Sequence, residues 1–268
     1  MSHPAEPVEQ TGPRRPLRVP VVGTGVSPVS YVDVLNQLEQ PPQARAQVFT
    51  FCNVHSVMTA RRDPEVRGAL ASADLATPDG MPLVWTLRGK GRREQSRVYG
   101  PDLMEFALAR GVALGWRHFL FGANDETLDA LEASARRLAP GVQLVGRLAP
   151  PYRPLTPAED AEVIVRIRES GANVVWVGLG MPKQELWMER VRDRLPGVSL
   201  LGVGAAFDLL AGTIPQAPDW IQDRGLEWAY RLLHEPRRLW RRYIVNNPAF
   251  AILALIEVAQ ARLGNRRA

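Results

Sequence analysis

Length, composition and charge limit what this chain can be. Its 268 residues suffice for one large α/β domain or a domain with an appendage, and 46% hydrophobic with 23% charged residues is typical of a soluble globular protein. The net charge is +5, and the single cysteine, Cys52, excludes an intrachain disulfide and a cysteine-based metal cluster. A reducing cytoplasm is therefore the simplest compartment.

Residues 1–20 are rich in proline and charge and lack the apolar run of a signal peptide, so we predict that they form a disordered tail. Over 21–213, apolar runs alternate with helical patterns, which predicts an α/β fold with a Rossmann-like, mainly parallel sheet flanked by helices. The predicted strands are Val48–Phe51, His118–Phe121, Val142–Val145, Val174–Val177 and Ser199–Val203. The predicted helices are Val54–Arg61, Pro64–Ala71, Pro101–Gly111, Glu126–Leu138, Pro157–Ser170 and Lys183–Arg194.

Strand signals stop near Gly212–Pro215, and 214–268 is predicted to be a helical, basic and aromatic appendage. Arg231, Arg238 and Arg241 are seven and three residues apart, which would place them on one helix face unless Pro236 interrupts or starts a helix. Arginine suits a diphosphate, and the tryptophans and tyrosines of this segment favour a membrane interface. An ordinary packing helix with a solvated basic face is the alternative. No apolar run is predicted to be long enough to span a membrane, since Ala249–Ile256 is followed by Glu257.

The turn Pro78-Asp79-Gly80 is the first of several candidate active-site loops. It follows a hydrophobic stretch and can hold a carboxylate at a fixed position. The same tripeptide is also a common β-turn, so an ordinary structural turn remains the alternative.

Two glycine loops follow predicted strands. In Gly178-Leu179-Gly180-Met181-Pro182-Lys183-Gln184, a strand runs into the start of a helix, where backbone N–H groups and the side chains of Lys183 and Gln184 can reach a phosphate or a sugar hydroxyl. The second loop, Gly202-Val203-Gly204, lacks the third glycine of a dinucleotide fingerprint, because Phe207 stands there. The sequence also lacks an Asp-x-Asp pair, a P-loop and a Gly-x-Ser-x-Gly elbow.

In chain order these motifs resemble those of the WecG/TagA/CpsF glycosyltransferases, family 26, from about Val21 to Pro248. The residues that carry the resemblance are Cys52-Asn53-Val54-His55, Ala73-Asp74-Leu75 with Pro78-Asp79-Gly80, Val98-Tyr99-Gly100-Pro101-Asp102-Leu103, Phe119-Leu120-Phe121-Gly122, Gly178 to Glu185, Gly202 to Asp208, and Glu227-Trp228-Ala229-Tyr230-Arg231.

The resemblance implies an inverting transferase that uses no metal and no other cofactor. Such an enzyme moves a sugar, often N-acetylmannosamine or a related hexose, from a UDP-sugar to a saccharide linked to polyprenyl diphosphate. The products serve teichoic acid, common antigen or exopolysaccharide synthesis. The appendage would dock on the inner face of the cytoplasmic membrane and close the active site, and the core could self-associate as a homo-oligomer.

The resemblance also implies roles for individual residues. Asp79 is the expected base, Asn53, Gly180, Lys183 and Gln184 are expected to contact substrate, and Arg231, Arg238 and Arg241 match the arginines implicated in activity. The sequence departs from the family where many members have Thr-x-Asn. Here Phe51-Cys52-Asn53 stands, with Thr50 one residue further back as the candidate substitute. Met81-Pro82-Leu83 replaces a run of small residues and bears on the sugar or acceptor pocket.

Two other functions remain open from the residues. The glycine turns would suit a nucleotide-binding oxidoreductase, against which the missing third glycine argues. The arginine cluster would suit a basic module that binds nucleic acid or membranes, although this leaves the Pro-Asp-Gly and Pro-Lys-Gln-Glu loops without a purpose. The resemblance favours an enzyme with no nucleic-acid partner.

Overall fold

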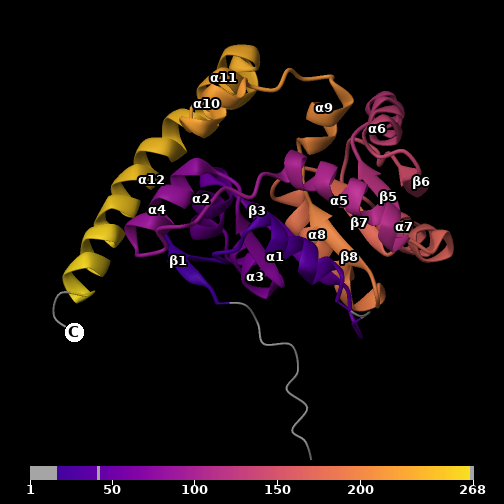
Figure 1. Ribbon diagram of the computed structural model, residues 1–268, viewed down its shortest axis with the longest axis horizontal. Coiled ribbons are helices and arrows are strands. Elements are labelled where there is room, and N and C mark those ends of the chain that lie inside the picture. The colour runs from indigo at the N-terminus through magenta and orange to yellow at the C-terminus, as the bar shows by residue number, and fades with distance from the viewer. Residues whose placement is uncertain (1–16, 41–42, 266–268) are drawn as a thin grey trace, which may run out of the picture.

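A central sheet of six parallel strands organises the protein in the computed structural model, which describes residues 17–40 and 43–265 (Figure 1). The strand order is β4-β3-β8-β7-β5-β6, and every neighbouring pair is parallel. The strands are β3 (Gln47–Cys52), β4 (Leu75–Pro78), β5 (Arg117–Gly122), β6 (Gln143–Leu148), β7 (Val174–Gly178) and β8 (Ser199–Gly202). The predicted α/β class with a Rossmann-like sheet is confirmed.

The predicted strands all occur, and β4 is an additional strand of this sheet in a stretch that the sequence assigned to a loop. Two further short strands, Val19–Val21 and Thr24–Val26, were not predicted either. The four residues of β4 are all buried, so they show no alternation of polar and apolar side chains. Short buried strands of this kind cannot be distinguished from apolar loops by periodicity.

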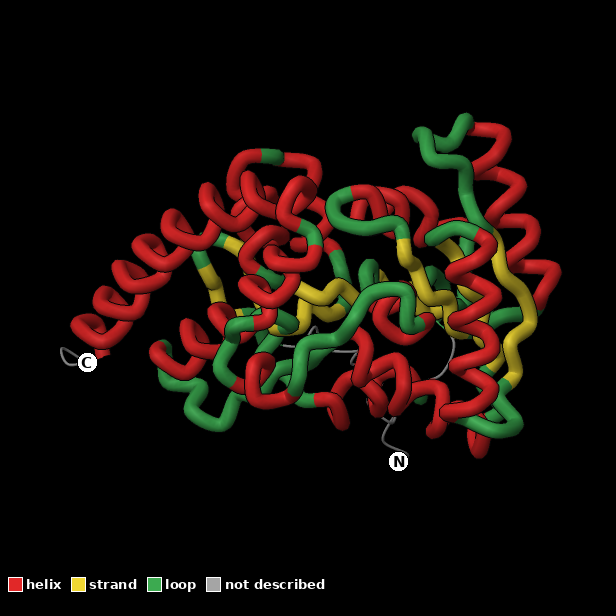
Figure 2. The backbone as a smooth tube through the Cα atoms, turned by 90° about the horizontal axis from the view of Figure 1, so that it is seen from above, coloured by secondary structure: helices red, strands yellow, loops and turns green. Residues whose placement is uncertain are grey.

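Side chains that alternate along the strands fill two layers of core. In β3, Phe49 and Phe51 face one layer and Val48 faces the other. The first layer is covered by α1 (Tyr31–Leu38), α5 (Gly100–Leu114), α6 (Asp125–Leu138) and α9 (Ala206–Ala211). The second is covered by α7 (Pro157–Ser170) and α8 (Lys183–Val191), which continues into the 3-10 turn η1 (Arg192–Arg194). Figure 2 shows the strands enclosed by these helices.

A third apolar cluster joins the end of the sheet to the C-terminal helix. It contains residues of α2 (Val54–Arg62), α3 (Pro64–Ser72), α4 (Met81–Gly89) and the hairpin of β1 (Val19–Val21) and β2 (Thr24–Val26). Phe250 and Ala254 from the C-terminal helix complete it. Of the predicted tail, residues 1–16 lie outside the described residues, and Val19 and Pro20 belong to β1.

The predicted helices are confirmed, and one of them, α7, begins with a clear local signal. Thr156 accepts a hydrogen bond from the Glu159 amide in a capping box, with Pro157 in the first turn of α7. By contrast, α4 begins at Met81 with no side-chain cap hydrogen bond, although Pro82 stands in its first turn. Three helices were not predicted: α1, α4 and α9.

The appendage consists of three helices rather than one continuous one. These are α10 (Asp219–Asp223), α11 (Glu227–His234) and α12 (Pro236–Asn265). Pro236 begins α12 after Glu235 leaves the helical conformation (φ −129°, ψ 54°). Proline fits the first turn of a helix, where its missing N–H needs no partner. Pro236 therefore starts a helix, which is the alternative that the sequence left open, and the three arginines share no single helix face, because Arg231 belongs to α11 and Arg238 and Arg241 to α12.

Helix α12 packs along one side of the core and leaves its opposite face uncovered (Figure 1). Its buried face includes Leu239, Tyr243, Asn246, Phe250 and Ala254. The uncovered face forms what we call the outer stripe, made of Ile244, Val245, Ile252, Leu255, Ile256 and Leu263, all exposed. Within the described residues, Leu239–Gly264 is long and apolar enough by length and composition to cross a membrane. The prediction that no segment reaches this length was wrong, because helix α12 extends well beyond Ala249–Ile256.

Candidate active site

Asp79 and Asn53 lie side by side at the carboxyl edge of the sheet. They follow β4 and β3, whose last residues Pro78 and Cys52 are paired in parallel register. The amides of Asp79 and Gly80 both donate to the carbonyl of Cys52, at 2.9 and 3.2 Å, which fixes the turn against β3. This edge is where open parallel α/β sheets bind their ligands.

Asn53 uses one end of its side chain for structure and leaves the other toward the site. Its Oδ1 accepts hydrogen bonds from the amides of His55 (3.0 Å) and Ser56 (3.3 Å), so Asn53 is the N-cap of α2. The side chain also hydrogen-bonds Asp79. Since the oxygen is committed to the cap, the amide nitrogen is the group that can face Asp79 or a substrate.

Asp79 is only partly exposed, and its surroundings favour the protonated form of its carboxyl group. Burial raises the pKa of Asp79 to about 6, the charge of Arg97 works against this rise, and the charge of Glu227 adds to it. Hydrogen bonds from the Gly100 amide, at 3.2 Å, and from Asn53 stabilise the carboxylate. A carboxylate with a pKa near neutrality can both hold a substrate proton and release it.

Arg97 was not among the site residues predicted from the sequence. Its Nε donates to the backbone carbonyl of Asp79 at 2.5 Å, and its Nη1 donates to Gln222 at 3.2 Å. Its Nη2 forms an ion pair with Glu227, so one guanidinium joins the Asp79 turn to the appendage. The only sequence signal was its position just before the Val98-Tyr99-Gly100 motif.

Tyr99 reinforces the same junction. Its hydroxyl donates to Glu227 Oε1 at 3.0 Å, and its ring lies 3.7 Å from the Arg97 guanidinium carbon. Burial raises the pKa of Tyr99, so the phenol stays protonated and acts as a donor. Glu227 therefore receives hydrogen bonds from two core residues.

A cavity of about 100 Å³ lies between the core and the appendage, directly over Asp79. Its core lining includes Asn53, His55, Asp79, Gly80 and Arg97. Its appendage lining comes from three segments: Gln222 and Gly225, then Glu227, Trp228 and Arg231, then Arg242, Tyr243 and Asn247. Residues of the appendage and of the Asp79 turn therefore line one cavity.

Gly225 allows this close approach of the appendage. A Cβ there would lie 2.6 Å from the Trp85 ring of α4 and 3.0 Å from Met81 Cβ, and the residue has φ +67°. Both the space and the backbone conformation favour glycine. The turn before α11 can therefore sit directly on α4, next to the Pro-Asp-Gly turn.

The three predicted arginines do not come together. Arg231 lines the cavity, and its buried Nε makes no hydrogen bond to the described residues. Arg241 is exposed and stacks near Trp240, with 5.2 Å between the guanidinium carbon and the ring centroid. Arg242, one residue further along α12, lines the cavity instead. The side chain of Arg238 lies outside the described residues.

Gln184 joins the two glycine loops at the sheet edge. Gln184 Oε1 accepts from the Gly180 amide at 3.1 Å, and its Nε2 donates to the Gly202 carbonyl at 2.6 Å. Gln184 is buried and lies outside the cavity lining, as do Gly180 and the exposed Lys183. Their substrate contacts remain predictions. In the same helix, burial raises the pKa of Glu185 to about 7.

Thr50 lies away from the cavity. It is buried in the middle of β3, where its hydroxyl donates to the Leu75 carbonyl at 3.4 Å. Its role as the substitute for a substrate-binding threonine gains no support from this position. His55, by contrast, does line the cavity, and burial together with Arg242 and Arg62 lowers its pKa to about 4.

The described residues contain no cluster of three or more His, Cys, Asp or Glu side chains that could hold a metal ion. The charged groups that face the cavity are instead arginines and two carboxylates. Cationic guanidinium groups and a carboxylate around one cavity can bind an anionic group and accept a proton beside it.

A comparison with protein-family models agrees with this geometry. The model described as the glycosyl transferase WecG/TagA/CpsF family matches residues 19–264. The match includes both sides of the cavity, the Asp79 turn and all three appendage helices. It confirms the resemblance carried by the sequence motifs.

Proposed function

Because the chain belongs to the WecG/TagA/CpsF family of glycosyltransferases, which act in cell-surface polysaccharide synthesis, we propose that it transfers a sugar from a UDP-sugar to a saccharide linked to polyprenyl diphosphate. The observation that carries this proposal is the cavity in which Asp79 meets Arg231 and Arg242 across the junction of core and appendage. N-acetylmannosamine or a related hexose is the proposed sugar.

The proposed reaction is a direct displacement with inversion at the anomeric carbon. An acceptor hydroxyl oxygen forms a bond to C1 of the sugar as the bond from C1 to the diphosphate oxygen breaks. The bonding electrons leave with the diphosphate, and Asp79 takes the proton of the acceptor hydroxyl. The raised pKa of Asp79 supports this role, because a base is most effective when its pKa is close to the working pH.

In this scheme, positively charged groups must neutralise the negative charge that develops on the departing diphosphate. Arg231 and Arg242 line the cavity on the appendage side and are placed to neutralise that charge without a metal ion. Arg241 faces outward beside Trp240, which suits contact with lipid headgroups better than contact with the nucleotide.

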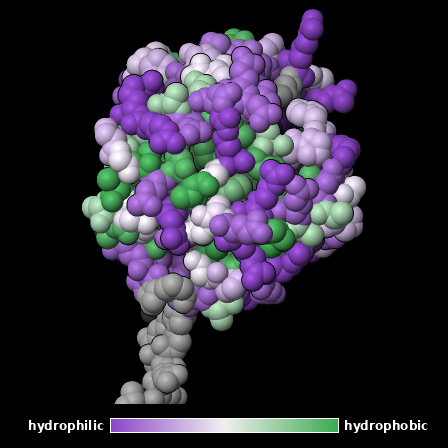
Figure 3. All heavy atoms as spheres, turned by 90° about the vertical axis from the view of Figure 1, so that its right-hand side faces the viewer, coloured by the Kyte–Doolittle hydropathy of each residue, from purple (hydrophilic) through white to green (hydrophobic). Residues whose placement is uncertain are grey.

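Docking of the appendage on the inner face of the cytoplasmic membrane is part of the proposal. The outer stripe of α12 exposes large apolar side chains. On the side remote from α12, Figure 3 shows hydrophilic residues with hydrophobic ones between them. The other face of α12 is packed on α2 and α4, so the helix would lie in the interface plane rather than cross the bilayer. A lipid-linked acceptor would then reach the cavity from the membrane surface.

A donor screen tests the proposed chemistry. Purified protein is mixed with a panel of UDP-sugars, a short polyprenyl-diphosphate saccharide and EDTA, and released UDP is measured. We expect release that depends on the acceptor with one donor, and a loss of about 10²–10⁴-fold in the isosteric Asp79→Asn variant. Asp129→Asn, at an exposed position of α6, is the matched control. Near-normal turnover of Asp79→Asn would remove Asp79 from the role of base.

A further inference from the structure

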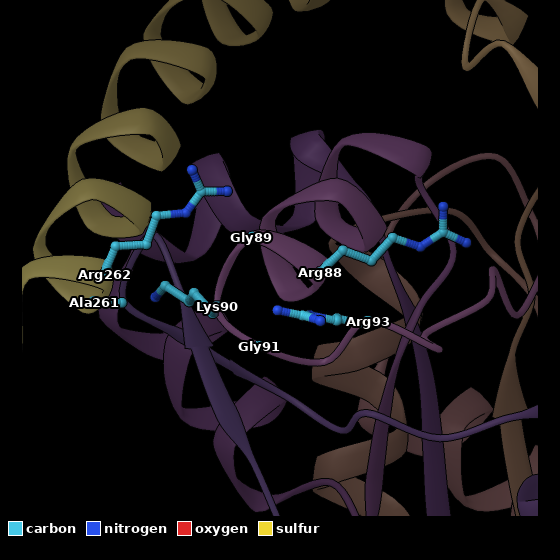
Figure 4. Close-up of a pocket in the computed structure, with 7 residues that line it drawn as sticks. All are labelled: Arg88, Gly89, Lys90, Gly91, Arg93, Ala261 and Arg262. Atoms are coloured by element: carbon cyan, nitrogen blue, oxygen red, sulfur yellow. The ribbon is translucent and has the colours of Figure 1, made fainter. Parts of the chain in front are cut away.

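A second cavity, of about 320 Å³, lies at the opposite end of α12 (Figure 4). It is formed by the end of α4, the turn that follows it, and the last turns of α12. Four of its lining side chains are basic, namely Arg88, Lys90, Arg93 and Arg262, and we call it the basic pocket. Neither the motifs of the sequence nor the proposed reaction involves these residues.

Close packing of two helices builds the basic pocket. A Cβ on Gly89 would lie 2.9 Å from the methyl carbons of Val258, so glycine allows α4 and α12 to meet here. Lys90 is fixed beside this contact, because its Nζ donates to the Pro20 carbonyl and to Glu257 Oε2, each at 2.6 Å. One wall of the pocket is thus held by three segments that are distant in the sequence.

The pocket carries an excess of positive charge. Glu257 balances Lys90, but Arg93 and Arg262 are exposed and make no ion pair within the described part of the chain. Figure 4 shows Arg93 directed toward Lys90, with Arg262 on the facing helix and the Arg88 guanidinium turned away. A cation near a helix C-terminus is often explained by the helix dipole, which favours positive charge there. Arg93 lies beyond the last residue of α4, so the dipole of that helix does not explain its position.

The basic pocket is separate from the catalytic cavity and adjoins the outer stripe. Twenty residues of α12 separate Arg242 from Arg262, which corresponds to roughly 30 Å along the axis. Ile256 and Leu263 of the outer stripe are exposed close to Arg262 on the same helix. An anion bound in the pocket would therefore be at the border of the apolar surface.

We propose that the basic pocket binds the phosphate of an anionic phospholipid headgroup while the acyl chains of that lipid lie along the outer stripe. The inference rests on the membrane-docking part of the proposed function. It gives α12 a second point of attachment, so that the helix lies flat and the catalytic cavity is held at a set distance from the bilayer. The ligand chemistry is a phosphate mono- or diester, and the apolar border selects the lipid as its source.

Vesicle co-sedimentation tests the site with the full-length protein. The double variant Arg93→Glu with Arg262→Glu is compared with Arg168→Glu with Arg194→Glu, which changes the net charge equally at exposed positions of α7 and η1. On vesicles of phosphatidylcholine and phosphatidylglycerol, we expect the pocket variant to bind on the order of tenfold more weakly than the control. On phosphatidylcholine alone, we expect the two to bind alike.

Several outcomes would overturn the inference. Equal weakening of both double variants would mean unspecific attraction to the charged surface. Displacement of the wild-type protein by glycerol phosphate or inorganic phosphate at constant ionic strength would assign the pocket to a free phosphate instead of a lipid. UDP release with a short soluble acceptor and no vesicles is measured in parallel, and the pocket variant should retain it. Absence of that activity in the wild type would count against the proposed reaction while leaving the vesicle result intact.

Discussion

Arg97 of the core and Glu227 of the appendage form an ion pair next to Asp79, with each side chain only 16% exposed. The pair connects the turn that carries the proposed base to the first residue of α11. The contact between appendage and core and the electrostatics of Asp79 are therefore linked through one guanidinium. Ion pairs shielded from water act more strongly than surface pairs, and loss of one partner leaves the other uncompensated.

Glu227→Gln should weaken this junction and change the pH dependence of catalysis. The amide keeps the size of the side chain but removes a negative charge that raises the pKa of Asp79. We expect the acidic limb of the kcat/KM profile to move to lower pH and kcat to fall about tenfold, because α11 docks less often. Hydrogen exchange of α11 and the pH profile are the measurements, with exposed Glu126→Gln as the control. An unchanged profile together with unchanged exchange would contradict the link.

Activity should rise with pH as Asp79 loses its proton. The base must be ionised to accept the acceptor proton, and burial holds its pKa at about 6. The expected kcat/KM is low below this pH and reaches a plateau above it. A profile whose acidic limb lies near pH 4, the ordinary aspartate value, would show that Asp79 is not buried in the working enzyme.

Asp79 should also make the fold less stable as the pH rises. Its folded-state pKa of about 6 lies above the ordinary value of 3.8, so the folded state binds more protons between these values. The stability contribution is complete below about pH 4 and is lost as the pH rises through about 6. At pH 7, Asp79→Asn should raise the free energy of unfolding by roughly 2 kcal/mol. Urea unfolding of both proteins at pH 4 and 7 measures this, and an equal difference at both pH values would contradict it.

We expect substitutions of the appendage arginines to affect activity differently, depending on whether the side chain lines the cavity. Arg231→Gln and Arg242→Gln each remove a cation from the cavity lining, so we expect kcat to fall about 10²-fold or more. Arg241→Gln alters an exposed side chain beside Trp240 and should retain activity toward a short soluble acceptor within about twofold. The measurement is UDP release without vesicles. A large loss in Arg241→Gln would require the appendage to rearrange when substrate binds.

Glu257→Gln should loosen the far end of α12. Glu257 Oε2 accepts from the Val22 amide at 3.0 Å and pairs with Lys90 at 2.6 Å. Val22 has φ +50°, a strained conformation for a β-branched residue that this contact helps to hold. We expect faster hydrogen exchange of α12 and a stability loss on the order of 1–2 kcal/mol. Glu162→Gln, whose partner Arg166 is exposed, should cost no more than about 0.5 kcal/mol.

Local signals in the sequence were sufficient to predict most helices and strands of the core. The helix after Thr156 was readable because its cap, first-turn proline and Glu159 are neighbours in the chain. The buried strands β5 and β7 were readable as apolar runs between turns. Among the elements that were missed, β4 and α9 are short and α4 has no side-chain cap hydrogen bond, whereas α1 has a capping box at Ser30 that the prediction did not use. Backbone hydrogen bonds to Cys52 and the third apolar cluster hold β4 and α4 in place.

By itself, the sequence determined the α/β class and the family, because these follow from the order of short local motifs along the chain, and the family resemblance made Asp79 a candidate base. Only the tertiary structure decided which residues share the site. Arg97 and Glu227 are 130 positions apart, and no pattern in the chain relates them. Likewise, the helix break at Glu235 and the packing of α12 turn Arg242 inward and Arg241 outward. The physical reason is that helix spacing specifies relative directions, whereas contacts with the rest of the fold specify which direction faces the cavity.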